Sequence, residues 1–259
     1  MSSVTGRIAQ IKQPRGGYIK PSQFSSRIMD DGNVLSSVEN VHASIVGMAV
    51  DYMTRYLMGT EIKEAFSISI QGAEVASSLI GINTANVVQE LLTGIKGIDD
   101  QSIINACKMV TFDVWFRNPM SAIMAKTAED TNPDADTIRN IRIMIQRSLA
   151  FWKEYGPITK DGFTFEEKGY TATVDTGDGD FLTSDTLWDF KVSKSKPTNK
   201  NTLQLLMYWI MGQHSGKPEF KDITKLGIFN PRLNTVYTLS MSEVPNDVIR
   251  AVEDNVICY

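Results

Sequence analysis

The stretch Gly177-Asp-Gly-Asp-Phe-Leu-Thr-Ser-Asp-Thr-Leu-Trp-Asp-Phe-Lys-Val192 decides how the C-terminal part of the chain folds. It predicts two short β-strands that are joined by a turn at Ser184-Asp185. Because side chains alternate along a strand, Asp189 and Lys191 share one face of the second strand with Leu187. The other face of that strand is entirely apolar. An acid and a lysine are therefore presented side by side.

A second acid, Asp180, belongs to the preceding strand and is expected to lie close to Asp189 across the tight turn. Two carboxylates at short range repel each other unless a proton or a cation lies between them. A hard divalent cation such as Mg²⁺ suits this position. Such an ion polarises a phosphodiester, and Lys191 can orient or deprotonate the attacking water or neutralise charge on the phosphorus. These residue types and their spacing predict phosphodiester hydrolysis.

Two further polar residues follow on a helix predicted at about 201–213. Gln204 and Tyr208 are four residues apart, so they point to the same side of that helix. Each carries a hydrogen-bonding group that costs free energy if it is buried without a partner. We therefore expect both side chains to face polar partners.

Hydrophobic periodicity divides the chain into a helical part and a sheet part. Helices are predicted at about 38–58, at 61–80 (where 67–70 also alternates as a strand would), from Asp99 or Asp100 onward, and from Asn132-Pro133 to Gly156-Pro157. Later elements are strands at 163–165, 170–174, 226–229 and 235–239, the last two forming a hairpin, and a helix at about 245–255. These elements predict an α/β (α+β) fold in which helices flank a mixed central sheet.

The distribution of Gly, Ser and Pro along the chain predicts three regions. Residues 1–37 are rich in these types and basic, which predicts an N-terminal arm with one short helical turn near residues 21–24. Residues 38–156 are expected to form a helical region that packs on the core, and residues 157–259 are expected to form the core itself.

Composition excludes several classes of protein. Apolar residues make up 42% and charged residues 22%, as in an ordinary globular protein. The sequence contains no run of about 18 apolar residues, so it predicts no membrane span. The N-terminus lacks the apolar segment of a secretory signal, and two cysteines provide no disulfide framework, so we expect a cytoplasmic protein. A net charge of −4 does not by itself indicate a nucleic-acid-binding protein.

The order of these motifs resembles a known family. An Asp on one strand, Asp-x-Lys on the next and Gln-x-x-x-Tyr on a helix look like the RecB-type branch of the PD-(D/E)XK nucleases, which includes recombination exonucleases and CRISPR-associated adaptation nucleases. The likeness covers roughly residues 163–213. It implies a restriction-endonuclease-like core in which Asp180, Asp189 and the main-chain carbonyl of Phe190 bind Mg²⁺ or Mn²⁺, with Lys191 as the catalytic lysine.

The resemblance also assigns roles to residues around this centre. Gln204 and Tyr208 would position the lysine and contact the nucleic-acid backbone, and His42 would complete the metal shell from an early helix. The two aspartates are nine positions apart, which is short for the family, so Asp178 and Asp175 remain rival ligands. The adaptation nucleases hold an iron–sulfur cluster through four cysteines, and two cysteines cannot do so; we expect no cluster.

The residues predict a metal-dependent nuclease, and the resemblance implies a deoxyribonuclease that acts on single-stranded DNA or DNA ends, with exonuclease action favoured over endonuclease action; the residues themselves leave exo and endo cleavage open. The basic residues Lys194, Lys196 and Lys200, with the N-terminal arm, would guide the phosphate backbone. One alternative is a non-catalytic nuclease-fold protein that binds nucleic acid or inhibits a protein, although the complete set of two aspartates and a lysine argues against it. Taken alone, Asp-x-Lys also fits a surface ion pair on an edge strand. A protein partner or a homo-oligomer stays open.

Overall fold

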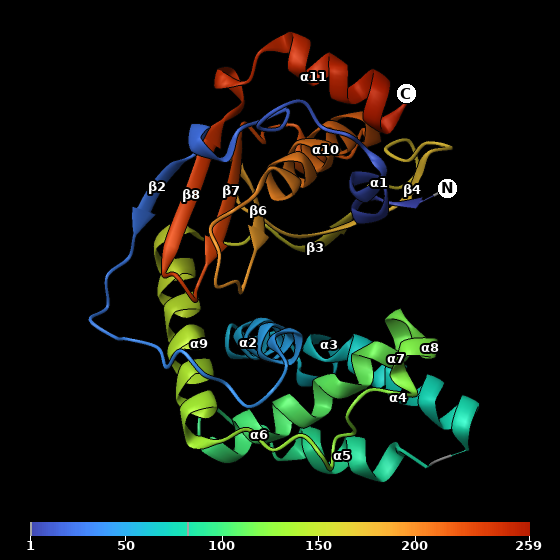
Figure 1. The fold of residues 1–259 in the computed structure, drawn as a ribbon, viewed down its shortest axis with the longest axis vertical. Coiled ribbons are helices and arrows are strands. Elements are labelled where there is room, and N and C mark those ends of the chain that lie inside the picture. Colours follow the sequence, from blue (N-terminus) through green and yellow to red (C-terminus); the bar gives the residue numbers. More distant parts are fainter. Residues whose placement is uncertain (1, 82) are drawn as a thin grey trace. The chain divides into compact units, whose positions relative to one another are not determined.

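The computed structural model describes residues 2–81 and 83–259, which form two compact units. Unit 1 joins residues 2–30 to residues 151–259 and contains the sheet, whereas unit 2 comprises residues 31–81 and 83–150 and is helical (Figure 1). The boundaries therefore differ from those predicted at residues 37 and 156. The N-terminal segment belongs to the same unit as the predicted core.

Unit 1 is built on a mixed sheet of six strands within the described residues, in the order β2-β8-β7-β6-β5-β3. These strands are β2 (Ser25–Ile28), β3 (Lys160–Thr164), β5 (Asp178–Leu182), β6 (Thr186–Phe190), β7 (Lys225–Asn230) and β8 (Thr235–Ser240). β6 and β7 run parallel, and the other neighbours are antiparallel. A parallel pair requires a crossover, which helix α10 (Asn199–Ser215) provides. The predicted mixed sheet and the predicted hairpin, now β7–β8, are confirmed.

Each face of this sheet packs against a different hydrophobic cluster. Leu187 of β6 and Leu226 of β7 lie in the cluster that contains the apolar residues of α10. On the opposite face, Trp188 packs among aromatic residues from 151–155, the last turn of α9 (Ala135–Tyr155). The rings of Phe151 and Phe229 stack there with centroids 4.1 Å apart. The predicted alternation along β6 is therefore confirmed.

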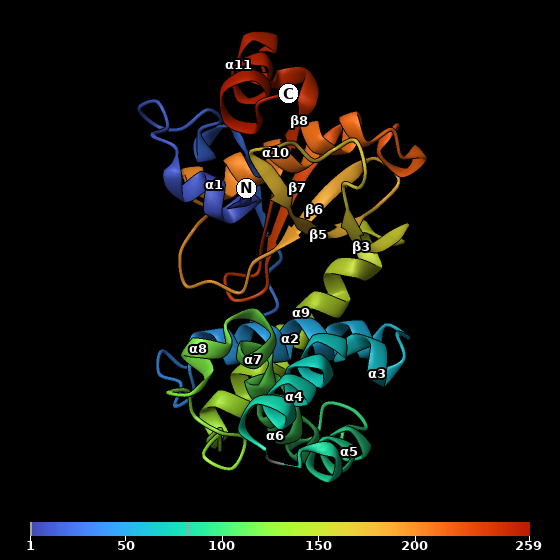
Figure 2. The same ribbon diagram turned by 90° about the vertical axis from the view of Figure 1, so that its right-hand side faces the viewer.

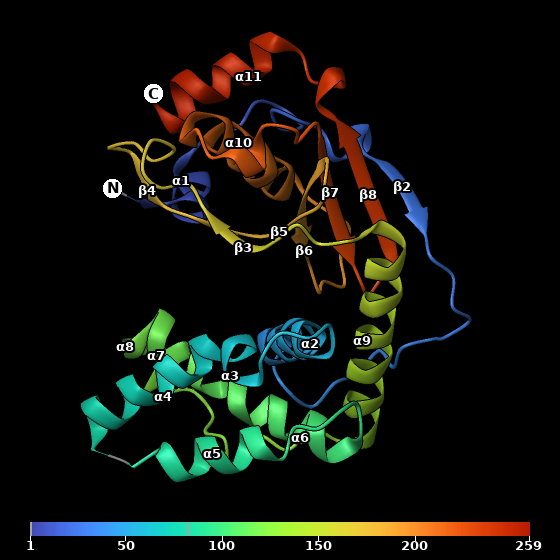
Figure 3. The same cartoon turned by 180° about the vertical axis from the view of Figure 1, so that it is seen from behind.

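The N-terminal segment is not the arm that its composition predicts. It forms β1 (Ser2–Ser3), α1 (Val4–Gln10), the short 3₁₀ helix η1 (Pro21–Gln23) and β2, which pairs with β8 at the sheet edge (Figure 3). Val4, Ile8, Ile19 and Phe24 are buried in the same cluster as α10. These scattered apolar residues fix the segment to unit 1, and the single turn expected at 21–24 is present as η1.

Unit 2 consists of helices and the turns between them. They are α2 (Ala43–Leu57), α3 (Ile62–Ala65), α4 (Ser67–Ile80), α5 (Ala85–Thr93), α6 (Asp100–Met109), η2 (Val110–Phe112), α7 (Asp113–Arg117), α8 (Pro119–Ala122) and most of α9. Asp99 caps α6, because its carboxylate accepts a hydrogen bond from the Ser102 amide at 3.0 Å. The alternating stretch 67–70 is helical. Among the described residues, none of the helices combines the length and apolarity needed to span a membrane.

The remaining elements of unit 1 differ from prediction mainly between β3 and β5. Residues 170–174 do not form the predicted strand: a turn occupies 166–169, and only Val174 enters a strand, β4 (Val174–Thr176), which pairs with β1. η3 (Pro218–Phe220) precedes β7, and β8 is followed by η4 (Met241–Glu243), α11 (Asn246–Val252) and a π-helical turn, η5 (Glu253–Ile257). The last predicted helix is thus present in two parts.

Gly179, in the middle of β5, is covered by the ring of Phe163 from β3. A Cβ atom on Gly179 would lie 2.0 Å from Cζ of Phe163. Replacing Gly179 with Ala should therefore overpack this contact and lower the free energy of unfolding of unit 1 by about 1–3 kcal/mol. Urea denaturation measures this change. Adding Phe163→Leu to the same chain should recover part of the loss, and a loss that is the same in both backgrounds would contradict the contact.

Candidate active site

The ladder between β5 and β6 sets two aspartates opposite each other. Phe181 pairs with Trp188 and Leu182 with Leu187, so one step further along the same register Asp180 lies opposite Asp189. Directly opposed residues of an antiparallel pair share a face. Because Leu182 and Leu187 face the cluster around α10, the two carboxylates lie on that side of the sheet. The sequence-predicted meeting of the two acids is therefore present in the structure.

Asp180 also reaches the backbone of the neighbouring strand. The amide of Phe190 donates a hydrogen bond to Oδ2 of Asp180 at 2.8 Å. This bond fixes the carboxylate of Asp180 beside the end of β6, next to Asp189. A role for the Phe190 carbonyl as a metal ligand stays a prediction.

The carboxylate of Asp189 is only 3% exposed, and its two oxygens have different surroundings. Oδ1 lies 2.9 Å from Nζ of Lys191. Oδ2 is buried and accepts no hydrogen bond from any described residue. A buried anionic oxygen without a partner costs free energy, and a cation placed between Asp189 and Asp180 would compensate it. Since β6 is an interior strand, this pair is not the surface ion pair on an edge strand that the motif alone allows.

Lys191 directly follows β6, and its backbone amide donates to the Phe229 carbonyl at 3.0 Å. The parallel ladder with β7 thus continues to this residue and orients its side chain. Burial opposes the positive charge of the ammonium, but the carboxylates of Asp189, Asp180 and Asp178 outweigh burial and raise the pKa of Lys191. The group is therefore a cation at neutral pH, surrounded by acids.

Helix α10 adds the predicted Gln–Tyr pair to this face of the sheet. Nε2 of Gln204 donates a hydrogen bond to Oη of Tyr208 at 2.9 Å, so the two side chains share one side of α10 as predicted. Tyr208 is only 4% exposed. Burial raises the pKa of its phenol, and the charges of Asp189 and Asp180 raise it further. The structure thus brings Asp180, Asp189, Lys191, Gln204 and Tyr208 together within unit 1.

Tyr170 holds the segment that leads into β5, a role that the sequence does not reveal. Its hydroxyl donates a hydrogen bond to the Gly177 carbonyl at 2.7 Å. A Cβ atom on Gly177 would lie 2.8 Å from Cγ2 of Val4 and 3.6 Å from Cε1 of Tyr208. The chain before Asp178 is therefore pressed closely between α1 and α10, which fixes where β5 begins.

The remaining candidate ligands lie at the start of β5, on β4 and before α2. Asp178 lies on β5 two residues before Asp180, on the same face but exposed, and Asp175 lies on β4. His42 belongs to unit 2, where it caps α2 through a hydrogen bond from the Ser44 amide to its Nδ1 at 3.2 Å. Its role as a metal ligand stays a prediction, as does that of the two rival aspartates.

Few side chains at the candidate active site could bind a metal ion. In the part of the chain that the structure describes, no three His, Cys, Asp or Glu side chains converge to hold a metal ion. Mg²⁺, however, is commonly bound by one or two carboxylates, with waters and phosphate oxygens completing its octahedron. Asp180 and Asp189 with a main-chain carbonyl fit that smaller set, and the partnerless Oδ2 of Asp189 favours it.

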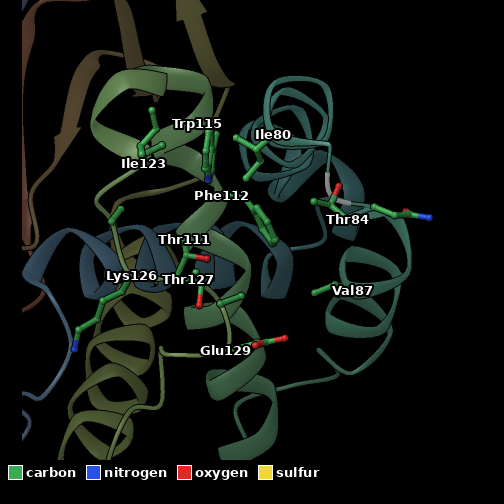
Figure 4. Close-up of a pocket in the computed structure, with 14 residues that line it drawn as sticks. Ile80, Thr84, Val87, Thr111, Phe112, Trp115, Ile123, Lys126, Thr127 and Glu129 are labelled. Carbon is green, nitrogen blue, oxygen red and sulfur yellow. The ribbon is translucent and has the colours of Figure 1, made fainter.

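Pockets also occur in unit 2. One of about 470 Å³ is lined by Ile80, Phe112, Trp115 and Ile123 among others, with Lys126 and Glu129 at its rim (Figure 4). Another of about 640 Å³ includes His42. Neither lining contains any of the five candidate active-site residues.

Comparison of the chain with protein-family models, with curated proteins and with solved structures gives no match.

Proposed function

We propose that this protein is a nuclease that depends on a divalent metal ion, with a restriction-endonuclease-like core of the RecB-type PD-(D/E)XK branch. The observation that carries the proposal is the buried Oδ2 of Asp189, which has no partner among the described residues. This oxygen lies on the face of the sheet where Asp180, on the neighbouring strand, is opposite Asp189. On the same face, Lys191 forms an ion pair with Asp189. A cation bound next to this oxygen would satisfy it and would also screen the repulsion between the two carboxylates.

The residues that would hold Mg²⁺ or Mn²⁺ are Asp180, Asp189 and the main-chain carbonyl of Phe190. When bound, such an ion polarises the phosphodiester and lowers the pKa of the attacking water. Asp180 is already fixed by the Phe190 amide and Asp189 by Lys191. The carboxylates are thus preorganised, which reduces the reorganisation needed to bind a cation.

Lys191 acts through its charge in this proposal. Its ammonium is paired with Asp189, so it is placed to stabilise negative charge that develops on the phosphate. Gln204 and Tyr208 would position Lys191. Tyr208, a neutral phenol, would also donate a hydrogen bond to a phosphate oxygen of the substrate backbone.

The proposed substrate is DNA, in single-stranded form or at ends, with exonuclease action favoured over endonuclease action. This choice follows from the resemblance to the RecB-type branch. The exposed Lys194, Lys196 and Lys200 support it, because they follow Lys191 directly in the chain and lead to the start of α10. Their charges suit contacts with a phosphate backbone.

The proposal is tested by incubating the purified chain with end-labelled single-stranded DNA, duplex DNA and RNA. Reactions contain EDTA, Mg²⁺ or Mn²⁺. We expect shortened DNA products only with a divalent ion, and fastest on single strands. Absence of cleavage of every nucleic acid under each metal would refute the nuclease and favour a non-catalytic protein of the same fold.

A further inference from the structure

Two basic segments that lie far apart in the sequence meet at the start of α10. Oγ1 of Thr202, on the first turns of α10, donates a buried hydrogen bond to the Ile19 carbonyl at 2.6 Å. Gly17 lies so close to α10 that a Cβ atom there would be 2.7 Å from Cβ of Asn199. Ile19 is itself buried in the core. The loop of residues 11–20 is therefore a fixed part of unit 1, beside the first residues of α10.

Both segments are free of acidic residues in the sequence. Residues 11–20 and 191–202 contain no Asp or Glu. Besides Lys191, they carry six exposed cations, here called the basic surface: Lys12, Arg15, Lys20, Lys194, Lys196 and Lys200. A single basic run is usually a solvated surface. Two runs held together by buried contacts concentrate like charge at one place, which costs electrostatic free energy unless a polyanion binds there.

The basic surface extends from the candidate active site to the N-terminal loop. Residues 191–198 connect the candidate active site at the end of β6 to the start of α10, and α1, which precedes the loop, lies along α10 (Figures 1 and 2). The side chain of Asn230 holds this connection, because its Nδ2 donates to the Ser193 carbonyl at 2.8 Å. The positive charges therefore run from the carboxylates to the N-terminal loop.

We infer that the basic surface binds the phosphate backbone of a single-stranded nucleic acid and leads it to the carboxylates. Delivery of the strand to the carboxylates rests on the proposed nuclease function. Binding of the strand to the basic surface does not require cleavage. Each phosphate neutralised on a single strand contributes about −0.7 to the slope of log K against log salt concentration. Three contacts from the N-terminal loop would therefore contribute about −2 to that slope.

The test measures binding in EDTA, where cleavage cannot interfere. A fluorescein-labelled 20-mer of deoxythymidine is titrated with the full chain at several salt concentrations, and anisotropy gives the dissociation constant. The triple variant Lys12→Gln/Arg15→Gln/Lys20→Gln should lose about 2 from the slope and bind about 100-fold more weakly near 0.1 M salt. Lys194→Gln/Lys196→Gln/Lys200→Gln should lose a similar amount.

A control with the same change in net charge separates local contacts from the overall field. Lys153, Lys168 and Lys221 are exposed residues of unit 1 outside the basic surface. Replacing all three with Gln should change the slope much less than either triple variant. Equal losses in the control and the two variants would show a diffuse charge effect and overturn the surface.

A pair of glycine variants tests the position of the loop without removing any charge. Gly16 and Gly17 have φ angles of +91° and +96°, so both replacements with Ala are strained by the backbone. Only at Gly17 does the new Cβ meet α10, whereas at Gly16 the nearest atoms belong to the flexible Lys20 side chain. Gly17→Ala should therefore weaken binding more than Gly16→Ala does. Thermal melting of both variants measures the loss of stability from the backbone strain that they share.

The outcomes for binding and for cleavage are distinct. Wild-type affinity and slope in both charge variants would overturn the basic surface, even if the protein cleaves DNA. Loss of binding in these variants, with no cleavage by the wild type, would support the surface and refute the nuclease. Binding to vesicles that contain phosphatidylserine, without binding to the oligonucleotide, would also overturn it.

Discussion

Replacing Asp180 with Asn is expected to lower the rate of metal-dependent DNA cleavage by about 10³-fold, since the metal ion supplies several kcal/mol of transition-state stabilisation. Without metal, the same variant should be as stable as the wild type or more stable, by up to about 1 kcal/mol, because it removes one of two directly opposed carboxylates. The Asn oxygen can still accept the Phe190 amide. Cleavage assays and urea denaturation in EDTA measure the two effects.

Asp178→Asn is the matched control for this variant. Asp178 lies on the same strand and the same face as Asp180, but it is exposed. We expect it to retain most of the cleavage activity. If Asp178→Asn abolished cleavage while Asp180→Asn preserved it, Asp178 would be the ligand and the assigned pair would be wrong.

Replacing Lys191 with Met should reduce cleavage by about 10²–10³-fold, because the variant loses a positive charge where negative charge develops. It should also destabilise the metal-free protein by about 1–3 kcal/mol, since the buried Asp189 carboxylate loses its partner. A divalent ion bound to that carboxylate would replace the missing charge. The stabilisation by Mg²⁺, measured as a shift in the urea midpoint, should therefore be larger in the variant than in the wild type.

The cleavage rate and the stability of Lys191→Met together distinguish a catalytic lysine from a structural one. A structural lysine would give the loss of stability without a loss of cleavage at saturating Mg²⁺. Unchanged cleavage by the purified variant would therefore remove Lys191 from the mechanism. Lys225→Gln, at an exposed ion pair with Asp185, serves as the control and should change neither quantity appreciably.

The local geometry of the site could be predicted because it depends on short-range periodicity. Alternation along β6 sets Leu187 and Asp189 on one face and Trp188 on the other, and the tight turn brings Asp180 opposite. The spacing of four residues aligns Gln204 with Tyr208 on α10. These relations need only the pitch of a strand or a helix, so the sequence contains them.

The placement of the N-terminal segment depends on contacts far along the chain and could not be predicted in this way. Ile19 and Phe24 are isolated apolar residues among Gly, Pro and Lys, and only their burial beside α10 shows that the segment is part of the core. Likewise, Tyr170 belongs to a stretch with the composition of a strand. Its hydroxyl instead clamps Gly177, a contact that no local pattern signals.

The pairing of the two basic segments is a further long-range feature. Sequence alone presents residues 11–20 and 191–202 as separate charged runs, each of which fits a solvated surface. The hydrogen bond from Thr202 to the Ile19 carbonyl joins them. The sequence predicts that both runs guide a phosphate backbone, but only the fold shows that they lie side by side.

The proposed nuclease activity requires a divalent cation held by Asp180 and Asp189. The most direct measurement is anomalous diffraction from crystals of the chain soaked in Mn²⁺, with crystals of Asp189→Asn treated identically. We expect an anomalous peak bridging the two carboxylates in the wild type and none in the variant. A fully soaked wild-type crystal with no manganese at this position, or with manganese bound only elsewhere, would contradict the account.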